Sequence, residues 1–185
     1  MGLSDYHQKQ RRLSDQEIER RLNVKSDELA AVFSRVAQPV VSGRPVRVGV
    51  LGCADIRYVS GHQKLFASIL GLPIDLTTFD ITVDHLAGAP GVVQHDCTLP
   101  LPDGPFDVLL AHVLLKFLDA DGQLALVQNG LHALNPGGVF ILVNDQEELT
   151  YGLIDVKNIK QVVEQSHAAW VESATKYGVA WVIVK

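Results

Sequence analysis

The sequence has few cysteines, no long apolar run and no excess of basic residues. Its two cysteines, Cys53 and Cys97, have no metal-ligand spacing and are too few for a disulfide framework. No apolar run approaches the roughly 20 residues that span a bilayer, and the charged N-terminus lacks the apolar core of a signal peptide. A net charge of -5 disfavours nucleic acid as a partner. We therefore predict a cytoplasmic protein with no membrane partner and no bound metal.

The 185 residues alternate apolar strands with helical segments over most of their length. Such alternation predicts right-handed crossovers and an α/β Rossmann-like fold, in which a doubly wound, mainly parallel sheet is covered by helices. We divide the chain into an N-terminal helical extension, residues 1–44, and a Rossmann-like domain, residues 45–185. The predicted strands of this domain are 46–51, 74–79, 91–95, 106–111, 138–143 and 179–184, and its long helices are 59–70, 120–134 and 156–177.

The N-terminal extension carries two candidate helix starts. Ser14 and Glu17 have the spacing of a capping box, in which each side chain bonds to the backbone of the other residue. Ser26 and Asp27 offer a second cap before another apolar stripe. We interpret the extension as a structural cap on the main domain, and the alternative is a lid over a substrate pocket.

The ligand site of an open parallel sheet lies beyond the carboxyl ends of the strands, where the strand order reverses. Gly52 follows the first strand, and a glycine there permits a tight loop whose N–H groups approach a ligand. Asp80 ends the second strand, where a carboxylate can accept hydrogen bonds from both ribose hydroxyls. Asp96 follows the third strand and can accept from an exocyclic amino group such as that of adenine. We expect these residues to surround one nucleoside-sized cleft.

Two further polar residues follow the later strands. His112 comes after the fourth strand and Asp145 after the fifth, so either side chain can align a reactant or accept a proton. A histidine on an apolar run can also be a structural residue, and this alternative stays open for His112. Cys53 and Cys97 fall in the predicted loops, where we interpret them as compact buried residues; a reactive pair is the alternative.

The stretch 96–108, DCTLPLPDGPFDV, resembles a segment of the class I S-adenosylmethionine (SAM) dependent methyltransferases, in particular the methyltransferase type 11-like group. In that family an aspartate, a Leu-Pro-Phe-Pro-Asp-Gly-Ser-like loop and a Phe-Asp-Val strand follow one another. The stretch 134–140, LNPGGVF, is similar to the family's Leu-Lys-Pro-Gly-Gly turn into the fifth strand. The resemblance covers about residues 46–144 and implies the class I methyltransferase fold.

The resemblance implies an enzyme that binds SAM and transfers its methyl group to a small molecule. No Asn/Asp-Pro-Pro-Tyr-like tetrapeptide follows the fourth strand, which disfavours an amino-base substrate. Methyl transfer is an in-line displacement from a sulfonium, for which His112 and Asp145 are the catalytic candidates. The backbone N–H of Cys97 is implied to bind the adenine. The cofactor-binding set is Gly52, Cys53, Ala54, Asp80, Ile81, Asp96, Cys97 and His112.

The first glycine motif of the family is degenerate in this chain. The family has an acidic residue and then three alternating glycines, where this sequence has Val50, Gly52, Ala54 and Ile56. Val50 removes one partner of the cofactor's amino group, and the branched Ile56 would fill the space of the methionine moiety. These changes favour an alternative, a non-catalytic methyltransferase-like binding or assembly module. A nicotinamide-dependent oxidoreductase is disfavoured because Gly-x-Gly-x-x-Gly is absent.

The C-terminal edge departs from the family as well. The family closes its sheet with two strands after the last long helix, one of them antiparallel. This sequence indicates only one, 179–184, so we predict an abbreviated C-terminal edge. An open apolar edge near Trp170 and Trp181 would accept a second subunit, which predicts a homodimer.

Overall fold

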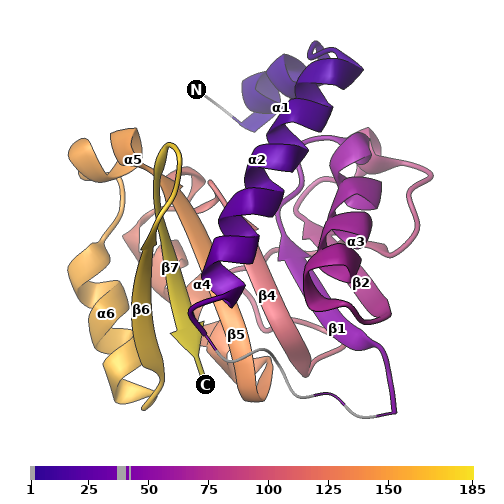
Figure 1. Ribbon diagram of the computed structural model, residues 1–185. Helices are drawn as coiled ribbons and strands as arrows, with labels where there is room; N and C mark the ends of the chain where they lie inside the picture. The colour runs from indigo at the N-terminus through magenta and orange to yellow at the C-terminus, as the bar shows by residue number, and fades with distance from the viewer. Residues whose placement is uncertain (1–2, 37–40, 42) are drawn as a thin grey trace.

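The computed structural model, which describes residues 3–36, 41 and 43–185, has one seven-stranded sheet that contains the six predicted strands and one further strand (Figure 1). The predicted strands recur with shifts of a few residues at their ends. A strand with apolar residues on both faces is what a sheet covered on both sides requires. The strands are β1 (Val46–Leu51), β2 (Ile74–Asp80), β3 (Val92–Gln94), β4 (Phe106–His112), β5 (Leu134–Asp145), β6 (Ala169–Ala174) and β7 (Gly178–Val184).

The strand order is β3-β2-β1-β4-β5-β7-β6. The pairs among β1 to β5 are parallel, whereas β7 runs antiparallel to both β5 and β6. The chain winds outward in one direction from β1 through β3 and then in the other direction from β4. The order therefore reverses between β1 and β4, which confirms the doubly wound, mainly parallel Rossmann-like sheet and fixes where a ligand crevice can form.

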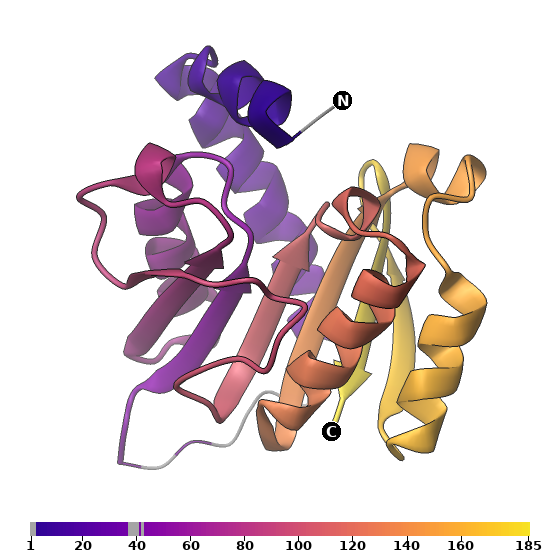
Figure 2. The same cartoon turned by 180° about the vertical axis from the view of Figure 1, so that it is seen from behind.

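Helices cover both faces of the sheet. On one face lie α2 (Asp15–Phe33) and α3 (Ile56–Leu70), and on the other lie α4 (Ala120–His132) and α6 (Val156–Gln165) (Figures 1 and 2). Each pair closes a separate apolar core, since Phe66 packs among the side chains of the first face and Phe140 among those of the second. The short α5 (Gln146–Thr150) follows β5 directly, and its carboxylate-rich first turn suits a helix N-terminus.

The C-terminal edge corrects the sequence prediction. The helix predicted over 156–177 ends at Gln165, because Ser166 closes it and His167 adopts a left-handed φ of 58°. The chain then forms β6, whose Trp170 ring lies 5.1 Å from that of the buried Trp181 on β7. The edge thus has both closing strands and is not abbreviated. The homodimer was predicted because this strand was expected to be absent, and that reason no longer applies.

The N-terminal segment forms two helices, α1 (Leu3–Arg11) and α2. One half of the predicted capping box forms, because the Ser14 hydroxyl accepts a hydrogen bond from the N–H of Glu17 at 3.2 Å, whereas the Glu17 carboxylate accepts from Arg20 and Arg21. The second cap was wrong: α2 continues through Ser26 and Asp27, whose polar side chains stay outside the apolar core. The C-terminal half of α2 contributes Leu29 and Phe33 to that core.

Within the described residues, no helix combines the length and the apolar character that crossing a membrane requires.

Candidate functional site

A cavity of about 350 Å³ opens at the carboxyl ends of β1 to β4, at the point where the strand order reverses. We call it the smaller cavity. Its volume lies within the roughly 300–1,000 Å³ that small-molecule sites occupy. The sequence-predicted cofactor residues all line it: Gly52, Cys53, Ala54, Asp80, Ile81, Asp96, Cys97 and His112.

The loop after β1 is built around Gly52. This glycine has a left-handed φ of 78°, and a Cβ there would lie 3.1 Å from a methyl of Leu114. Its N–H donates to the carbonyl of Phe79 at 2.8 Å, which ties the loop to the end of β2. Neither Ala54 nor Ile56 is among the described residues with a positive φ. Only the first of the family's three glycines is therefore required by the backbone here.

Asp80 fixes the other side of this loop. The carboxylate is 4% exposed, and its Oδ2 accepts a hydrogen bond from the N–H of Cys53 at 2.8 Å. Its Oδ1 accepts from the N–H of Thr82 at 3.0 Å. A carboxylate oxygen can accept more than one hydrogen bond, so both oxygens keep capacity for a ligand. Ile81 follows on the cavity rim as an exposed apolar side chain.

The segment after β3 supplies the opposite wall. Asp96 Oδ1 accepts hydrogen bonds from the backbone N–H and the hydroxyl of Thr98, which hold the pKa of this carboxyl below its usual range. Burial raises the pKa of the Cys97 thiol to about 12 and that of Cys53 to about 11. Both cysteines are free and protonated at neutral pH, so the structure gives neither the character of a reactive thiol.

Helix α1 adds two residues that the sequence did not predict. Tyr6 and His7 line the smaller cavity, and the His7 ring stacks on that of His85 with centroids 4.0 Å apart. Potential ligand atoms of His7, Asp80 and His85 lie within 4.8 Å of one another. However, His85 Nε2 lies 2.6 Å from the carbonyl of Cys53 and must carry a proton to bond with it. That nitrogen is then no metal ligand.

A cavity of about 900 Å³ adjoins the first, and we call it the larger cavity. The two cavities share a wall that includes the Gly52 loop and His112, whereas Asp145 lines only the larger one. Burial holds the pKa of His112 well below its usual value, and the nearby charge of Lys25 lowers it further. Burial also raises the pKa of Asp145. At neutral pH His112 is therefore a neutral imidazole at the junction of the two cavities.

Backbone strain marks the same junction. Val113, directly after His112, has a φ of 58°, and its N–H donates to the carbonyl of Val143 at 2.8 Å. A β-branched residue rarely adopts this conformation, which costs roughly 1–3 kcal/mol and is concentrated at functional sites. The sequence carries no signal for it, because valine is an ordinary strand residue.

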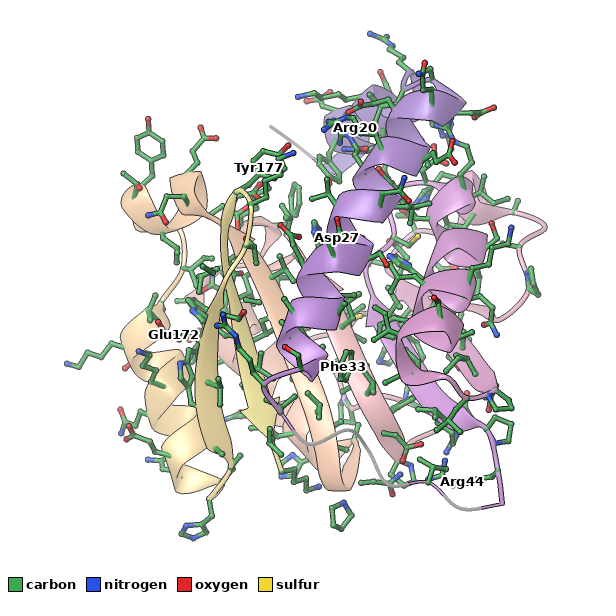
Figure 3. The ribbon with its side chains drawn as sticks, in the orientation of Figure 1. Arg20, Asp27, Phe33, Arg44, Glu172 and Tyr177 are labelled. Atoms are coloured by element: carbon green, nitrogen blue, oxygen red, sulfur yellow. The ribbon has the colours of Figure 1, made fainter. Side chains whose placement is uncertain are left out.

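The larger cavity is lined by the N-terminal helices and by the tip of the β6–β7 hairpin. The tip of the β6–β7 hairpin reaches α2, where the N–H of Lys176 donates to Glu28 Oε1 at 2.7 Å. The Arg20 guanidinium beside Tyr177 lowers the pKa of that phenol. Figure 3 shows Arg20 and Tyr177 at the same end of the molecule, whereas Phe33 lies toward the other end of α2. Residues of α1, α2 and this hairpin all line the cavity.

The larger cavity also contains a buried basic pair. Lys25 Nζ lies 2.9 Å from His62 Nε2, and the two side chains come from α2 and α3. Lys25 is 8% exposed and His62 is 2% exposed. Lys25 Nζ also lies 5.2 Å from the centroid of the Tyr58 ring. Sequence reasoning missed this pair, because a lysine and a histidine 37 positions apart show no common pattern.

Solved methyltransferase structures share this architecture. A SAM-dependent methyltransferase from Clostridium acetobutylicum aligns with a TM-score of 0.64 at 10% identity, covering 88% of this chain and 91% of that chain. The N-methyltransferase NodS from Bradyrhizobium japonicum, in complex with S-adenosyl-L-homocysteine, aligns with a TM-score of 0.58 at 15% identity, covering 86% of each chain. An O-methyltransferase family protein from Burkholderia thailandensis aligns with a TM-score of 0.58 at 13% identity, covering 86% of this chain and 56% of that chain.

These likenesses establish that the chain has the class I methyltransferase fold, as the resemblance implied. No family model matches the sequence, and no curated protein matches it.

Proposed function

We propose that this protein is a SAM-dependent methyltransferase that acts on a small-molecule acceptor. The observation that carries the proposal is the convergence of the Gly52 loop, Asp80 and Asp96 on one cavity at the switch point of the sheet. SAM, when bound, supplies a methyl group on a sulfonium. The fold supports the same function, because solved methyltransferases share it and one of them is in complex with S-adenosyl-L-homocysteine.

The residues of the smaller cavity fit the cofactor part by part. Asp80 is buried at the end of β2, where it can accept from the ribose hydroxyls. Asp96 and the backbone N–H of Cys97 lie at the end of β3, where they can bind the adenine edge. Gly52 brings the backbone of the β1–α3 loop close to the ligand, because it has no side chain to hold that ligand away.

The degenerate glycine motif is compatible with this arrangement. Ile56 is the first residue of α3, is 39% exposed, and lines neither cavity. This position speaks against Ile56 filling the space of the methionine moiety, which was one of the three reasons to favour a non-catalytic module. Ala54 lines the cavity without needing a left-handed backbone. The loss of the acidic residue at Val50 is the departure that remains.

The larger cavity is the place for the methyl acceptor, because it shares a wall with the smaller one. Alignment and removal of a proton from the attacking atom are the tasks left to the protein. His112 lies on the shared wall and is neutral, so one ring nitrogen can accept that proton. Asp145 lines the larger cavity alone and is the second candidate for the same role.

Isothermal titration calorimetry with SAM and S-adenosyl-L-homocysteine tests the proposal. We expect micromolar binding, about -8 kcal/mol, to the wild type. Asp80→Ala and Asp96→Ala should both weaken it by at least about tenfold, since each removes an acceptor of ligand hydrogen bonds. Asp75→Ala is the matched control, because Asp75 is an exposed aspartate on the same strand as Asp80. No binding of either ligand to the folded wild type would refute the proposal.

A further inference from the structure

Lys25 is a buried cation without a carboxylate partner. Among the described residues, no carboxylate lies within ion-pair distance of it, and its hydrogen-bond partner is the neutral ring of His62. The half-buried cations of the larger cavity are paired, Arg21 with Glu17 at 2.8 Å and Lys116 with Glu148 at 2.9 Å, whereas Lys9 is exposed to solvent. A buried charge is strongly destabilising unless an opposite charge compensates it. Among the described residues of this cavity wall, Lys25 is thus the buried cation that lacks a carboxylate partner.

His62 shares this deficit. Its Nε2 faces Lys25 Nζ, and its Nδ1 is buried with no hydrogen-bond partner in the described part of the chain. Burial keeps the pKa of His62 well below its usual value, and Lys25 lowers it further, so the ring stays neutral and accepts from the ammonium. Native proteins leave few buried polar groups unpaired, and an unpaired group calls for an explanation, such as a catalytic role or a bound water or ion. Two neighbouring side chains with unmet partners therefore indicate a binding site.

The place of the pair shows which part of a ligand it faces. Lys25, His62 and Val50 line the larger cavity together with the Gly52 loop that both cavities share. Val50 stands where the resembling family has an acid for the cofactor's amino group. Val50 carries no charge, and Lys25 from α2 places a positive charge in the same cavity wall. The preferred ligand group there is consequently an anion.

We propose that Lys25 and His62 form a carboxylate-binding site in the wall of the larger cavity. This inference rests on the proposed function, because it takes the neighbouring cavity to be the SAM site. A single ammonium balances the single charge of a carboxylate, whereas a phosphate dianion would need further cations. The carboxylate has two sources, the amino-acid end of the cofactor or the methyl acceptor, and the experiment separates them.

The site couples carboxylate binding to proton uptake. Burial lowers the pKa of Lys25 to about 8, while the nearby Cys53 and Glu28 raise it. Above about pH 8 the free site loses the proton of Lys25, and a carboxylate must recover it to bind the ammonium, so affinity should fall as the pH rises above about 8. The other groups that face Lys25 are Tyr58, His62 and His112.

The first arm of the test compares S-adenosyl-L-homocysteine with methylthioadenosine, which keeps the nucleoside and thioether but has no amino-acid end. Calorimetry is run on the wild type, on Lys25→Met and on Lys64→Met, an exposed control on α3. If the cofactor supplies the carboxylate, Lys25→Met weakens S-adenosyl-L-homocysteine by at least about tenfold and leaves methylthioadenosine unchanged. The wild-type affinity for the first ligand should also fall above pH 8, and that of Lys25→Met should fall less.

The second arm titrates benzoate, with benzamide as the uncharged control, into protein saturated with S-adenosyl-L-homocysteine. Benzoate binding that is lost in Lys25→Met, together with an unchanged first arm, assigns the site to the acceptor. If Lys25 matters in neither arm, the carboxylate site is refuted. If the wild type binds neither adenosine ligand, the proposed function fails, and benzoate binding to the free protein decides the carboxylate site alone. Lys25→Gln, which keeps a polar group, replaces Lys25→Met in both arms if the latter does not fold.

Discussion

Replacing Lys25 with methionine is expected to stabilise the ligand-free protein. Burial lowers the pKa of this lysine from 10.5 to about 8, so the folded state binds the proton less tightly than the unfolded chain does. That difference corresponds to about 3 kcal/mol of the free energy of unfolding. Methionine occupies a similar volume without a charge, and replacing buried charges by apolar residues is often stabilising. Lys25→Met should therefore gain up to about 3 kcal/mol at pH 7.

The pH dependence identifies the cause of this gain. Below pH 8 both states carry the proton, and the folded wild type bears the full penalty. Between about 8 and 10.5 the unfolded chain binds more protons than the folded protein, so wild-type stability rises with pH relative to Lys25→Met. The advantage of the variant should thus be full below pH 8 and vanish near pH 10.5.

Urea unfolding at pH 7 and pH 10 measures the difference between wild type and variant directly. Lys64→Met removes an exposed lysine and should stay within about 0.5 kcal/mol of the wild type at both values. A Lys25→Met protein that is less stable than the wild type at pH 7 would refute the reasoning. So would a gain of the same size at both pH values, because it would come from packing and not from charge.

Three further predictions concern the scaffold. Gly130→Ala should lower the free energy of unfolding by about 1–3 kcal/mol in urea unfolding, because the added Cβ would lie 2.4 Å from the Phe140 ring. Helix propensity alone predicts that this substitution stabilises the protein. Gln123→Leu should lower the free energy of unfolding by about 3 kcal/mol, since the buried Gln123 amide donates to three backbone carbonyls and accepts from one N–H; a neutral effect in urea unfolding would contradict this. Burial raises the pKa of Asp107, but hydrogen bonds, chiefly from Arg44, outweigh it and hold this pKa low. Asp107 therefore stabilises above its unfolded pKa of 3.8, and acid titration should show wild type losing more stability below pH 3.8 than Asp107→Asn.

The fold was predictable because most strands and helices leave a local pattern of apolar residues in the sequence. Buried strands such as Val46–Leu51 read as apolar runs, and their alternation with helices fixes the winding of the sheet. β6 was missed because Trp170 continues the apolar spacing of the helix before it, and only the left-handed His167 separates the two elements. α1 was missed because its polar sequence has no apolar stripe to signal a helix.

The candidate site was predictable where it depends on topology. Asp80 and Asp96 end neighbouring parallel strands, so their approach to one cavity follows from strand order alone. We expected Ile56 to block the cofactor because it stands at a glycine position of the family motif. In the structure it begins α3, and its side chain is exposed to solvent. Lys25 and His62 meet through the packing of α2 on α3, which no local pattern encodes.

Helix α2 constrains how a ligand can reach the cavities. Its C-terminal half packs on one face of the sheet through Leu29 and Phe33. The Glu28 carboxylate accepts a hydrogen bond from the backbone N–H of Lys176 in the β6–β7 hairpin. None of the described residues of α1, by contrast, belongs to an apolar core. Because α1 is held by aromatic contacts of Tyr6 and His7 and not by those cores, we expect its displacement to leave the cores intact and to take both side chains out of the smaller cavity. We expect the nucleoside to enter when α1 is displaced, while α2 stays in place.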